Sequence, residues 1–189
     1  MQEGTMRRPA GPEVVVGVGD CRFAQYPDGA LATYALGSCL AIIAFDWKIR
    51  LGGLLHVMLP DSSIDRAAAG RNPFVYVDTG VPELIRRIEE KGGLKRRMRC
   101  SVVGGASMMA DSSHFEIGKR NYLALKKAFW KQGLFIDTED VGGTESRSVR
   151  LDLATGRVDL RKGAAPGRIL TPAAISLMGS MKDNAGIAG

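Results

Sequence analysis

Two side chains in the first third of the chain have the chemistry of a nucleophile and its base. Cys39 lies in a turn of small residues, L-G-S-C, and His56 is one of only two histidines. A thiolate attacks carbonyl carbon, and a paired imidazole lowers the thiol pKa from its free value of about 8.5. Gly37 and Ser38 leave room for a substrate carbonyl, whose oxyanion nearby N–H groups can hold. These residues predict cysteine hydrolase or acyl-transfer chemistry.

The flanking segments predict how the two residues meet. Apolar runs at 40–45 and 51–59 lie on either side of a polar break, a pattern typical of a β-hairpin. With an even loop centred between Trp47 and Lys48, Cys39 lies directly opposite His56, and such partners have Cβ atoms about 4.5–5.5 Å apart. The break lacks the Asn-Gly or Asp-Gly turn that would fix the register, so the register is inferred. A loop of three or five residues would shift the pairing, and Cys39 would no longer lie opposite His56.

Each of these residues also has a structural interpretation. A free cysteine usually behaves as a small buried hydrophobe, and a lone histidine beside apolar residues is commonly a hydrogen-bonded core residue. The core interpretation is the better one for Cys21, after a Gly-Asp turn, and for Cys100, in the strand-like run R-C-S-V-V. The three cysteines lack C-x-x-C spacing, which argues against a disulfide framework and a structural zinc site.

Length and composition predict one domain in a reducing compartment. The 189 residues fit a single domain, and 45% hydrophobic content is enough for one core. No apolar run approaches the roughly 20 residues of a membrane span, and no secretory signal is visible. We therefore expect a cytoplasmic protein without membrane insertion. It would have a flexible leader (1–12), a single catalytic domain (13–162) and a mostly disordered Ala/Gly/Pro-rich tail (163–189).

The positive charge is concentrated in one stretch of the chain. The net charge is +6, and much of the excess lies in 86–99, RRIEEKGGLKRRMR. This stretch is typical of a solvated helix face and its following loop, although clustered charge can also steer an acidic protein. Aromatic residues make up only 6%, and no RRM, zinc-finger or helix-turn-helix pattern occurs, so we expect no nucleic-acid binding.

The remaining segments predict α+β layering. Apolar residues recur at helical spacing from 81 to 88, with Asp78 or Thr79 as the cap, and a second helix is expected over 119–132. Strands are expected at 13–19, 30–36, 99–103 and 134–138, with a hairpin over 149–160. Two main helices among many strands, without regular alternation, predict mostly antiparallel or mixed sheets with the helices on one face.

Several blocks of sequence also resemble one known family. They are T-x-x-L-G-S-C at 33–39, G-G-L-x-H-V-M-L-P-D-S at 52–62, V-D-T-G-V at 77–81, V-x-G-G-A-S-M at 102–108, I-G-x-R-N at 117–121 and E-D-x-G-G-x-x-x-R-S-V at 139–149. Their types and order are similar to those of the chemoreceptor glutamine deamidases, the CheD family, over residues 14–162. The resemblance implies a three-layer α/β/β sandwich.

The resemblance also implies a function and a third site residue. It makes Thr33 the residue that orients His56, although a neutral hydroxyl cannot offset imidazolium charge. It implies conversion of glutamine to glutamate in the cytoplasmic helices of chemoreceptors (methyl-accepting chemotaxis proteins), with release of ammonia, no cofactor, and binding to the phosphatase CheC. The alternatives are a non-catalytic adaptor for receptors or CheC that docks through 86–99, a thiol peptidase, and an esterase.

Overall fold

Two five-stranded sheets form the body of the protein. The structure, a computed structural model, describes residues 11–107 and 116–170. Sheet A has the order β1 (Glu13–Val15), β3 (Ala30–Leu36), β8 (Arg147–Asp152), β9 (Val158–Lys162) and β10 (Arg168–Ile169). Sheet B has the order β2 (Asp20–Gln25), β5 (Leu51–Val57), β4 (Leu40–Asp46), β6 (Met98–Gly104) and β7 (Thr138–Val141). Both sheets are mixed, because β1 pairs parallel with β3 and β6 pairs parallel with β7, whereas the other described pairs are antiparallel.

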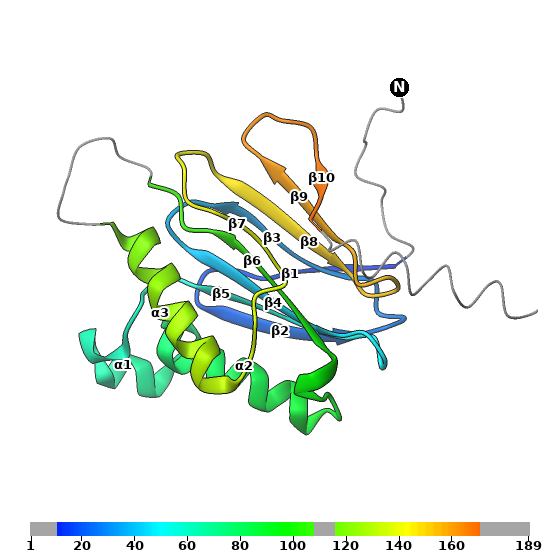
Figure 1. Ribbon diagram of the computed structural model, residues 1–189, viewed down its shortest axis with the longest axis horizontal. Coiled ribbons are helices and arrows are strands. Elements are labelled where there is room, and N and C mark those ends of the chain that lie inside the picture. The colour runs from blue at the N-terminus through cyan, green and yellow to red at the C-terminus, as the bar shows by residue number, and fades with distance from the viewer. Residues whose placement is uncertain (1–10, 108–115, 171–189) are drawn as a thin grey trace, which may run out of the picture.

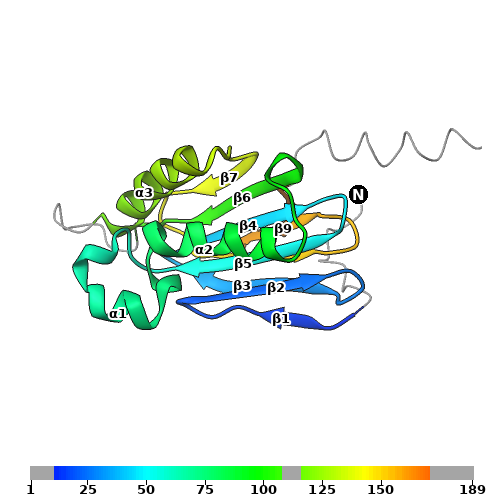
Figure 2. The same ribbon diagram turned by 90° about the horizontal axis from the view of Figure 1, so that it is seen from below.

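The helices form a third layer. Helices α2 (Val77–Glu90) and α3 (Ile117–Gln132) pack on one face of sheet B, and sheet A lies against the other face (Figures 1 and 2). A short helix, α1 (Arg66–Arg71), precedes α2. Leu84 and Leu125 belong to the core between helices and sheet B, whereas Leu31 and Ile43 belong to the core between the sheets. The predicted α+β fold, a three-layer α/β/β sandwich, is confirmed. No helix of the described residues is long and apolar enough to cross a membrane.

Some element boundaries differ from the predicted ones. Helix α2 begins at Val77, so Asp78 and Thr79 lie inside it; the Asp78 carboxylate instead accepts hydrogen bonds from the backbone and hydroxyl of Ser62. The strand expected over 134–138 is β7, which starts at Thr138, and β2 was not expected at all. Strand β7 has the sequence T-E-D-V at the edge of its sheet, where no apolar alternation is required.

Two predicted boundaries fall partly outside the described residues. The leader, 1–12, is described only from residue 11, and the predicted tail, 163–189, only as far as residue 170. Within that part of the tail, β10 pairs with β9, and Leu170 is buried. The described sheet therefore continues past residue 162, where the sequence predicted the end of the domain.

The hairpin formed by β4 and β5 has a different register from the predicted one. Asp46 pairs with Leu51, so the loop covers residues 47–50, and Ala41 rather than Cys39 lies opposite His56. The prediction of a direct Cys39–His56 pair is therefore wrong by two residues. Because side chains alternate along a strand, a shift of two keeps both residues on the same face of the sheet.

The buried carboxylate of Asp46 explains this register. It accepts the backbone N–H groups of Lys48 (3.0 Å) and Ile49 (3.4 Å) inside the loop, and that of Leu94 (2.9 Å) from outside it. It also forms an ion pair with Arg97 at 2.7 Å. Burial alone would raise the Asp46 pKa, but Arg97 and the three N–H groups together hold it below its usual range. The loop length thus depends on a carboxylate satisfied by residues far along the chain.

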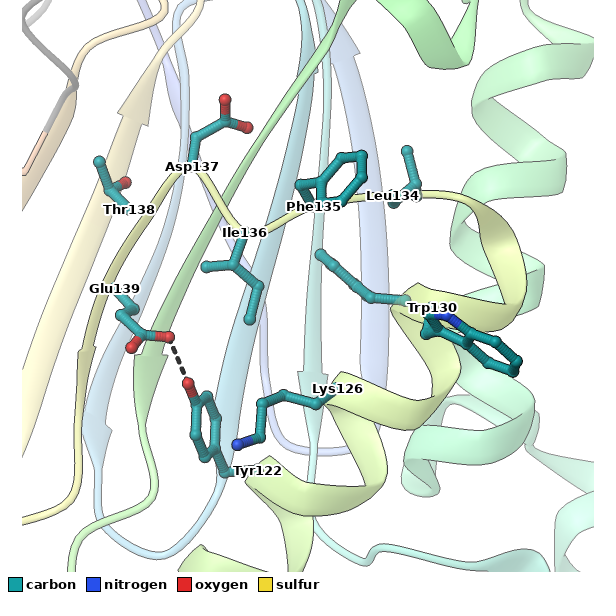
Figure 3. Close-up of a pocket in the computed structure, with 10 residues that line it drawn as sticks. Tyr122, Lys126, Trp130, Leu134, Phe135, Ile136, Asp137, Thr138 and Glu139 are labelled. Atoms are coloured by element: carbon teal, nitrogen blue, oxygen red, sulfur yellow. Dashed lines mark hydrogen bonds between the residues drawn. The ribbon is translucent and has the colours of Figure 1, made fainter.

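An open groove lies between α3 and β7 (Figure 3). Strand β7 is the edge of sheet B, and the Tyr122 hydroxyl donates to the Glu139 carboxylate on it at 2.6 Å. Trp130 and Phe135, beside the groove, are 81% and 84% exposed. None of the residues that line this groove belongs to the site predicted from the sequence.

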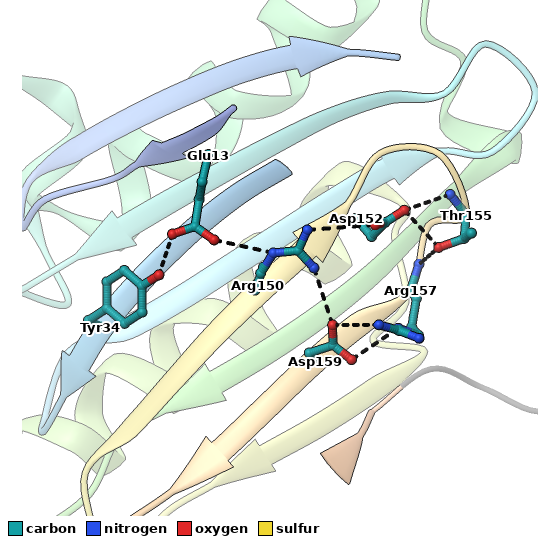
Figure 4. A network of polar contacts seen from close by, with 7 residues as sticks. All are labelled: Glu13, Tyr34, Arg150, Asp152, Thr155, Arg157 and Asp159. Carbon is teal, nitrogen blue, oxygen red and sulfur yellow. Dashed lines mark hydrogen bonds and ion pairs between the residues drawn. The ribbon is translucent and has the colours of Figure 1, made fainter. Parts of the chain in front are cut away.

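Charged side chains cover the outer face of sheet A. Arg150, on β8, lies among the carboxylates of Glu13 (3.2 Å), Asp152 (3.6 Å) and Asp159 (3.3 Å), and Arg157 also pairs with Asp159 (Figure 4). The Arg150 side chain is only 5% exposed, so its aliphatic stem covers the sheet while its charge is neutralised. A sheet with one face toward solvent needs such a polar covering.

We predict that Asp46→Asn destabilises the protein in a pH-dependent way. Losing a buried charge partner of Arg97 costs about 3 kcal/mol at neutral pH. Because the folded-state pKa is lowered, the stabilisation by ionised Asp46 is complete above the unfolded-state pKa of about 3.9 and is lost as the pH falls through the lower folded-state value. Urea unfolding between pH 7 and pH 3 should show the two proteins converging below about pH 4. The exposed Asp28→Asn is the matched control, and a pH-independent difference for Asp46→Asn would contradict the prediction.

Candidate active site

A hydrogen bond between the two sheets joins two of the predicted site residues. Thr33 lies on β3 of sheet A and His56 on β5 of sheet B, and Thr33 Oγ1 is 2.9 Å from His56 Nδ1. Both side chains are buried, with 1% and 3% of their surface exposed. Before the structure, only the family resemblance indicated this pair.

The partners of Thr33 determine the protonation of the imidazole ring. The Thr33 hydroxyl donates to the Val16 carbonyl at 2.7 Å. A hydroxyl has one hydrogen, so in the contact with His56 the ring Nδ1–H must donate to Oγ1. In the neutral ring, Nε2 then carries the lone pair. Nε2 is buried and has no hydrogen-bond partner among the described residues. The ring therefore offers a base to any proton donor that reaches it.

Cys39 lies on the same face of sheet B as this base. It immediately precedes β4, in which Ala41 is opposite His56, so Cys39 is a diagonal neighbour of the histidine. Diagonal neighbours are about 7–8 Å apart, within reach of a long side chain. Cys39 is half-buried against the core between the sheets, whereas Cys21 and Cys100 are buried. The structure thus brings Cys39, His56 and Thr33 into one region.

The turn that carries Cys39 has its carbonyl groups bonded, whereas its N–H groups have no oxygen partner in the described part of the chain. The Gly37 carbonyl accepts from Ala106 N–H and the Cys39 carbonyl from Gly105 N–H, each at 2.8 Å. The N–H groups of Gly37, Ser38 and Cys39 donate to no carbonyl or side-chain oxygen in the described part of the chain. Three consecutive N–H groups beside a thiol have the composition of an oxyanion hole.

A bulge in β3 directs the chain toward this turn. The pairing of β3 with β8 shifts register between Thr33 and Leu36, and Ala35 in the bulge has a φ of 55°. That conformation costs a residue other than glycine roughly 1–2 kcal/mol. Ala35 N–H donates weakly to the Ser148 hydroxyl at 3.5 Å. Bulges of this kind re-aim the chain beside functional sites, and here the chain leaves sheet A and enters sheet B as β4.

The site depends on three further residues to which the sequence analysis assigned no role in the site. Val16 contributes a main-chain carbonyl, which no side-chain pattern can reveal. Gly104 has a φ of 120°, and a Cβ there would meet the Cys39 carbonyl oxygen at 2.2 Å, so only glycine fits. Asn121, on α3, donates to the carbonyls of Ser38 and Met58. A polar residue at a core position of a helix was the available signal for Asn121.

Burial keeps the thiol and the imidazole neutral. It raises the pKa of the Cys39 thiol, an effect that its own backbone N–H partly offsets. It lowers the pKa of His56, an effect that the Val16 carbonyl partly offsets. The expected lowering of the Cys39 thiol pKa is therefore wrong, because burial raises it instead.

Internal ion pairs occupy most of the basic stretch 86–99. Glu83 pairs with both Arg86 and Arg87, and Glu90 pairs with Arg86. Asp46 pairs with Arg97, and Asp137 with Arg99. Among the described residues, Lys91, Lys95 and Arg96 form no ion pair, and Lys95 donates instead to the Gln132 side chain. Much of the local positive charge is thus compensated within the protein, which weakens the argument for a docking surface there.

Comparison with known proteins identifies one family. A family profile described as "CheD chemotactic sensory transduction" matches residues 58–162. A Solibacter usitatus protein named "Probable chemoreceptor glutamine deamidase CheD" is 49% identical over 150 residues, 79% of this chain and 89% of the relative. A Syntrophus aciditrophicus protein named "Probable chemoreceptor glutamine deamidase CheD 1" is 41% identical over 158 residues, 84% and 99% of the two chains. A Thermococcus kodakarensis protein with the same name as the first is 40% identical over 152 residues, 79% and 92%.

We predict that iodoacetamide modifies Cys39 before the other two cysteines. Cys39 is half-buried, whereas burial raises the pKa of Cys100 to about 12 and that of Cys21 still further. The Cys39 rate should keep rising into the alkaline range, because its own thiol pKa is also raised. Peptide mass spectrometry after timed labelling measures the three rates, with unfolded protein as the control in which all three react. Equal labelling of Cys100 in the folded protein would contradict the prediction.

Proposed function

Because the chain belongs to the CheD family, we propose that it is a cysteine-dependent protein-glutamine deamidase of chemoreceptors. Its substrates would be specific glutamine side chains in the cytoplasmic helices of these receptors, converted to glutamate with release of ammonia. The names of the relatives support the deamidase activity. The observation that carries the chemistry is the unpartnered Nε2 of His56, among the described residues, on the same sheet face as the Cys39 thiol.

The first half of the reaction would form a thioester. Cys39 Sγ attacks the carboxamide carbon while the thiol proton passes to His56 Nε2, and the carbonyl π electrons move to oxygen. The N–H groups of Gly37, Ser38 and Cys39 stabilise that oxyanion. The oxyanion then collapses, the C–N bond breaks, and the imidazolium returns its proton to the nitrogen, which leaves as ammonia.

The second half would hydrolyse the thioester and free the receptor's new glutamate side chain from Cys39. His56 takes a proton from a water molecule, the resulting hydroxide attacks the thioester carbon, and the C–S bond breaks. The imidazolium returns the proton to the Cys39 sulfur, so both groups regain their neutral state. Throughout the cycle Nδ1–H continues to donate to Thr33, which keeps Nε2 directed toward the reacting atoms.

The receptor substrate rests on the family rather than on the site geometry. The arrangement of thiol, base and N–H groups suits acyl transfer in general, so hydrolysis of receptor methyl esters would need no additional groups. Binding to CheC, which the family resemblance implies, stays a prediction. The non-catalytic adaptor alternative differs from the deamidase in one respect: it requires no reactive thiol.

We predict that Cys39→Ala abolishes deamidation of a receptor cytoplasmic fragment and that His56→Ala lowers its rate by about 10²-fold or more. Deamidation is measured by intact-peptide mass spectrometry as a gain of about one dalton per site, the mass difference between an amide and an acid. Cys100→Ala is the matched control, because that thiol is buried with its pKa raised to about 12.

The same spectra separate the alternatives. Deamidation that survives in Cys39→Ala would exclude the cysteine mechanism. Shorter receptor fragments would indicate a thiol peptidase, and loss of a methyl group from a methylated fragment would indicate an esterase. Binding to the fragment without any mass change would favour the adaptor.

We also predict an unusually low acidic limit of activity. Burial lowers the His56 pKa, so the neutral base form persists below the ordinary histidine value of about 6.5. As the pH falls through the lowered value, the ring becomes protonated and kcat/KM should fall with it. A pH profile of kcat/KM on the receptor fragment measures this limit. A midpoint above 6.5 would show that burial does not govern this group.

A further inference from the structure

Asn121 contacts both halves of the candidate active site through one side-chain amide. Its Nδ2 donates to the carbonyl of Ser38 at 3.1 Å and to that of Met58 at 3.0 Å. Ser38 directly precedes Cys39, and Met58 follows His56 at the end of β5. Among the described residues these two carbonyls have no other donor. The amide is thus a direct link between the turn of the nucleophile and the strand of the base.

Helix α3 also contacts the segment that is hydrogen-bonded to the turn of Cys39. Gly118, on α3 with Asn121, packs against Gly105 so closely that a Cβ would meet the Gly105 carbonyl oxygen at 2.4 Å. Gly105 in turn donates its N–H to the Cys39 carbonyl. Helix α3 therefore holds the turn at two points, through the amide of Asn121 and through the backbone beside Gly118.

The hydrogen bonding of the Asn121 amide is uneven, because its N–H groups are paired and its oxygen is not. Asn121 is fully buried, and its Oδ1 has no hydrogen-bond partner among the described residues. An apolar residue would avoid that unpaired oxygen but would leave the Ser38 and Met58 carbonyls without a donor. The benefit of the residue lies in its two N–H bonds, which require a forked donor at this point on the helix.

We propose that Asn121 is a positioning residue that sets the distance between the Cys39 thiol and His56 Nε2. The proposal rests on the proposed cysteine mechanism and adds a residue to it from the third layer of the fold. It does not assign Asn121 any contact with substrate.

The test is a double-mutant cycle on thiol alkylation, which needs no receptor. In otherwise unchanged protein, His56→Ala should slow iodoacetamide alkylation of Cys39 at pH 7 by about 10-fold or more, because the base is lost. In the Asn121→Leu background the same change should slow it less than about 3-fold, because thiol and base are already apart. Cys21 and Cys100 in the same digest report any general opening of the fold.

A second readout separates positioning from stability. Asn121→Leu should lower kcat for deamidation by about 10–100-fold with KM within about 3-fold, since misplacement of reacting groups affects the chemical step. Leu125→Ala, at a buried position of the same helix, is the control for lost packing and should leave kcat within about 3-fold. Asn121→Gln retains a forked donor and should restore part of the rate.

Three results would overturn the proposal. The first is an equal effect of His56→Ala in both backgrounds. The second is a fall in kcat with Leu125→Ala as large as that with Asn121→Leu at the same melting temperature. The third is an absence of any His56→Ala effect in unchanged protein, which would remove the cysteine–histidine pair itself. If Asn121→Leu does not fold, Asn121→Ser, which keeps a polar group but not the fork, takes its place in the cycle.

Discussion

The hydrogen bond from His56 to Thr33 is the interaction on which the site depends. It joins a strand of sheet A to a strand of sheet B inside the core, and the Val16 carbonyl fixes its direction by taking the only hydrogen of the Thr33 hydroxyl. That direction leaves Nε2 as the acceptor. A carboxylate in place of Thr33 would hold the ring equally well but would raise the pKa of the imidazole. The neutral hydroxyl orients the ring and leaves its pKa to burial.

Each layer of the fold contributes one part of the site. Sheet A provides Thr33, sheet B provides His56 and the strand that follows Cys39, and the helix layer provides Asn121. The proposed nucleophile, Cys39, lies in the connection that crosses from one sheet to the other, after the bulge at Ala35. The position of the Cys39 thiol relative to the His56 ring is therefore a property of how the three layers pack.

The alternation of side chains along the hairpin was predicted correctly, whereas the pairing of its two strands was not. Cys39 and His56 could be assigned to one face of a hairpin, and the assignment survived because the register error was an even number of residues. The loop length itself could not be predicted, since it depends on Asp46 and its partner Arg97, which is 51 residues away in sequence. The roles of the Val16 carbonyl and of Gly104 follow from backbone proximity, which appears only after the chain has folded. The fold class was predictable because it depends on periodicity, which is local.

The unpaired Nε2 of His56 and Oδ1 of Asn121, both buried and unpartnered in the described part of the chain, have a thermodynamic consequence. A buried polar atom without a hydrogen-bond partner lowers the free energy of unfolding. The two unpaired atoms therefore lower the stability of the fold, one on β5 and the other on α3. A molecule that donates a hydrogen bond to His56 Nε2 would remove part of this cost, so its binding should stabilise the folded protein.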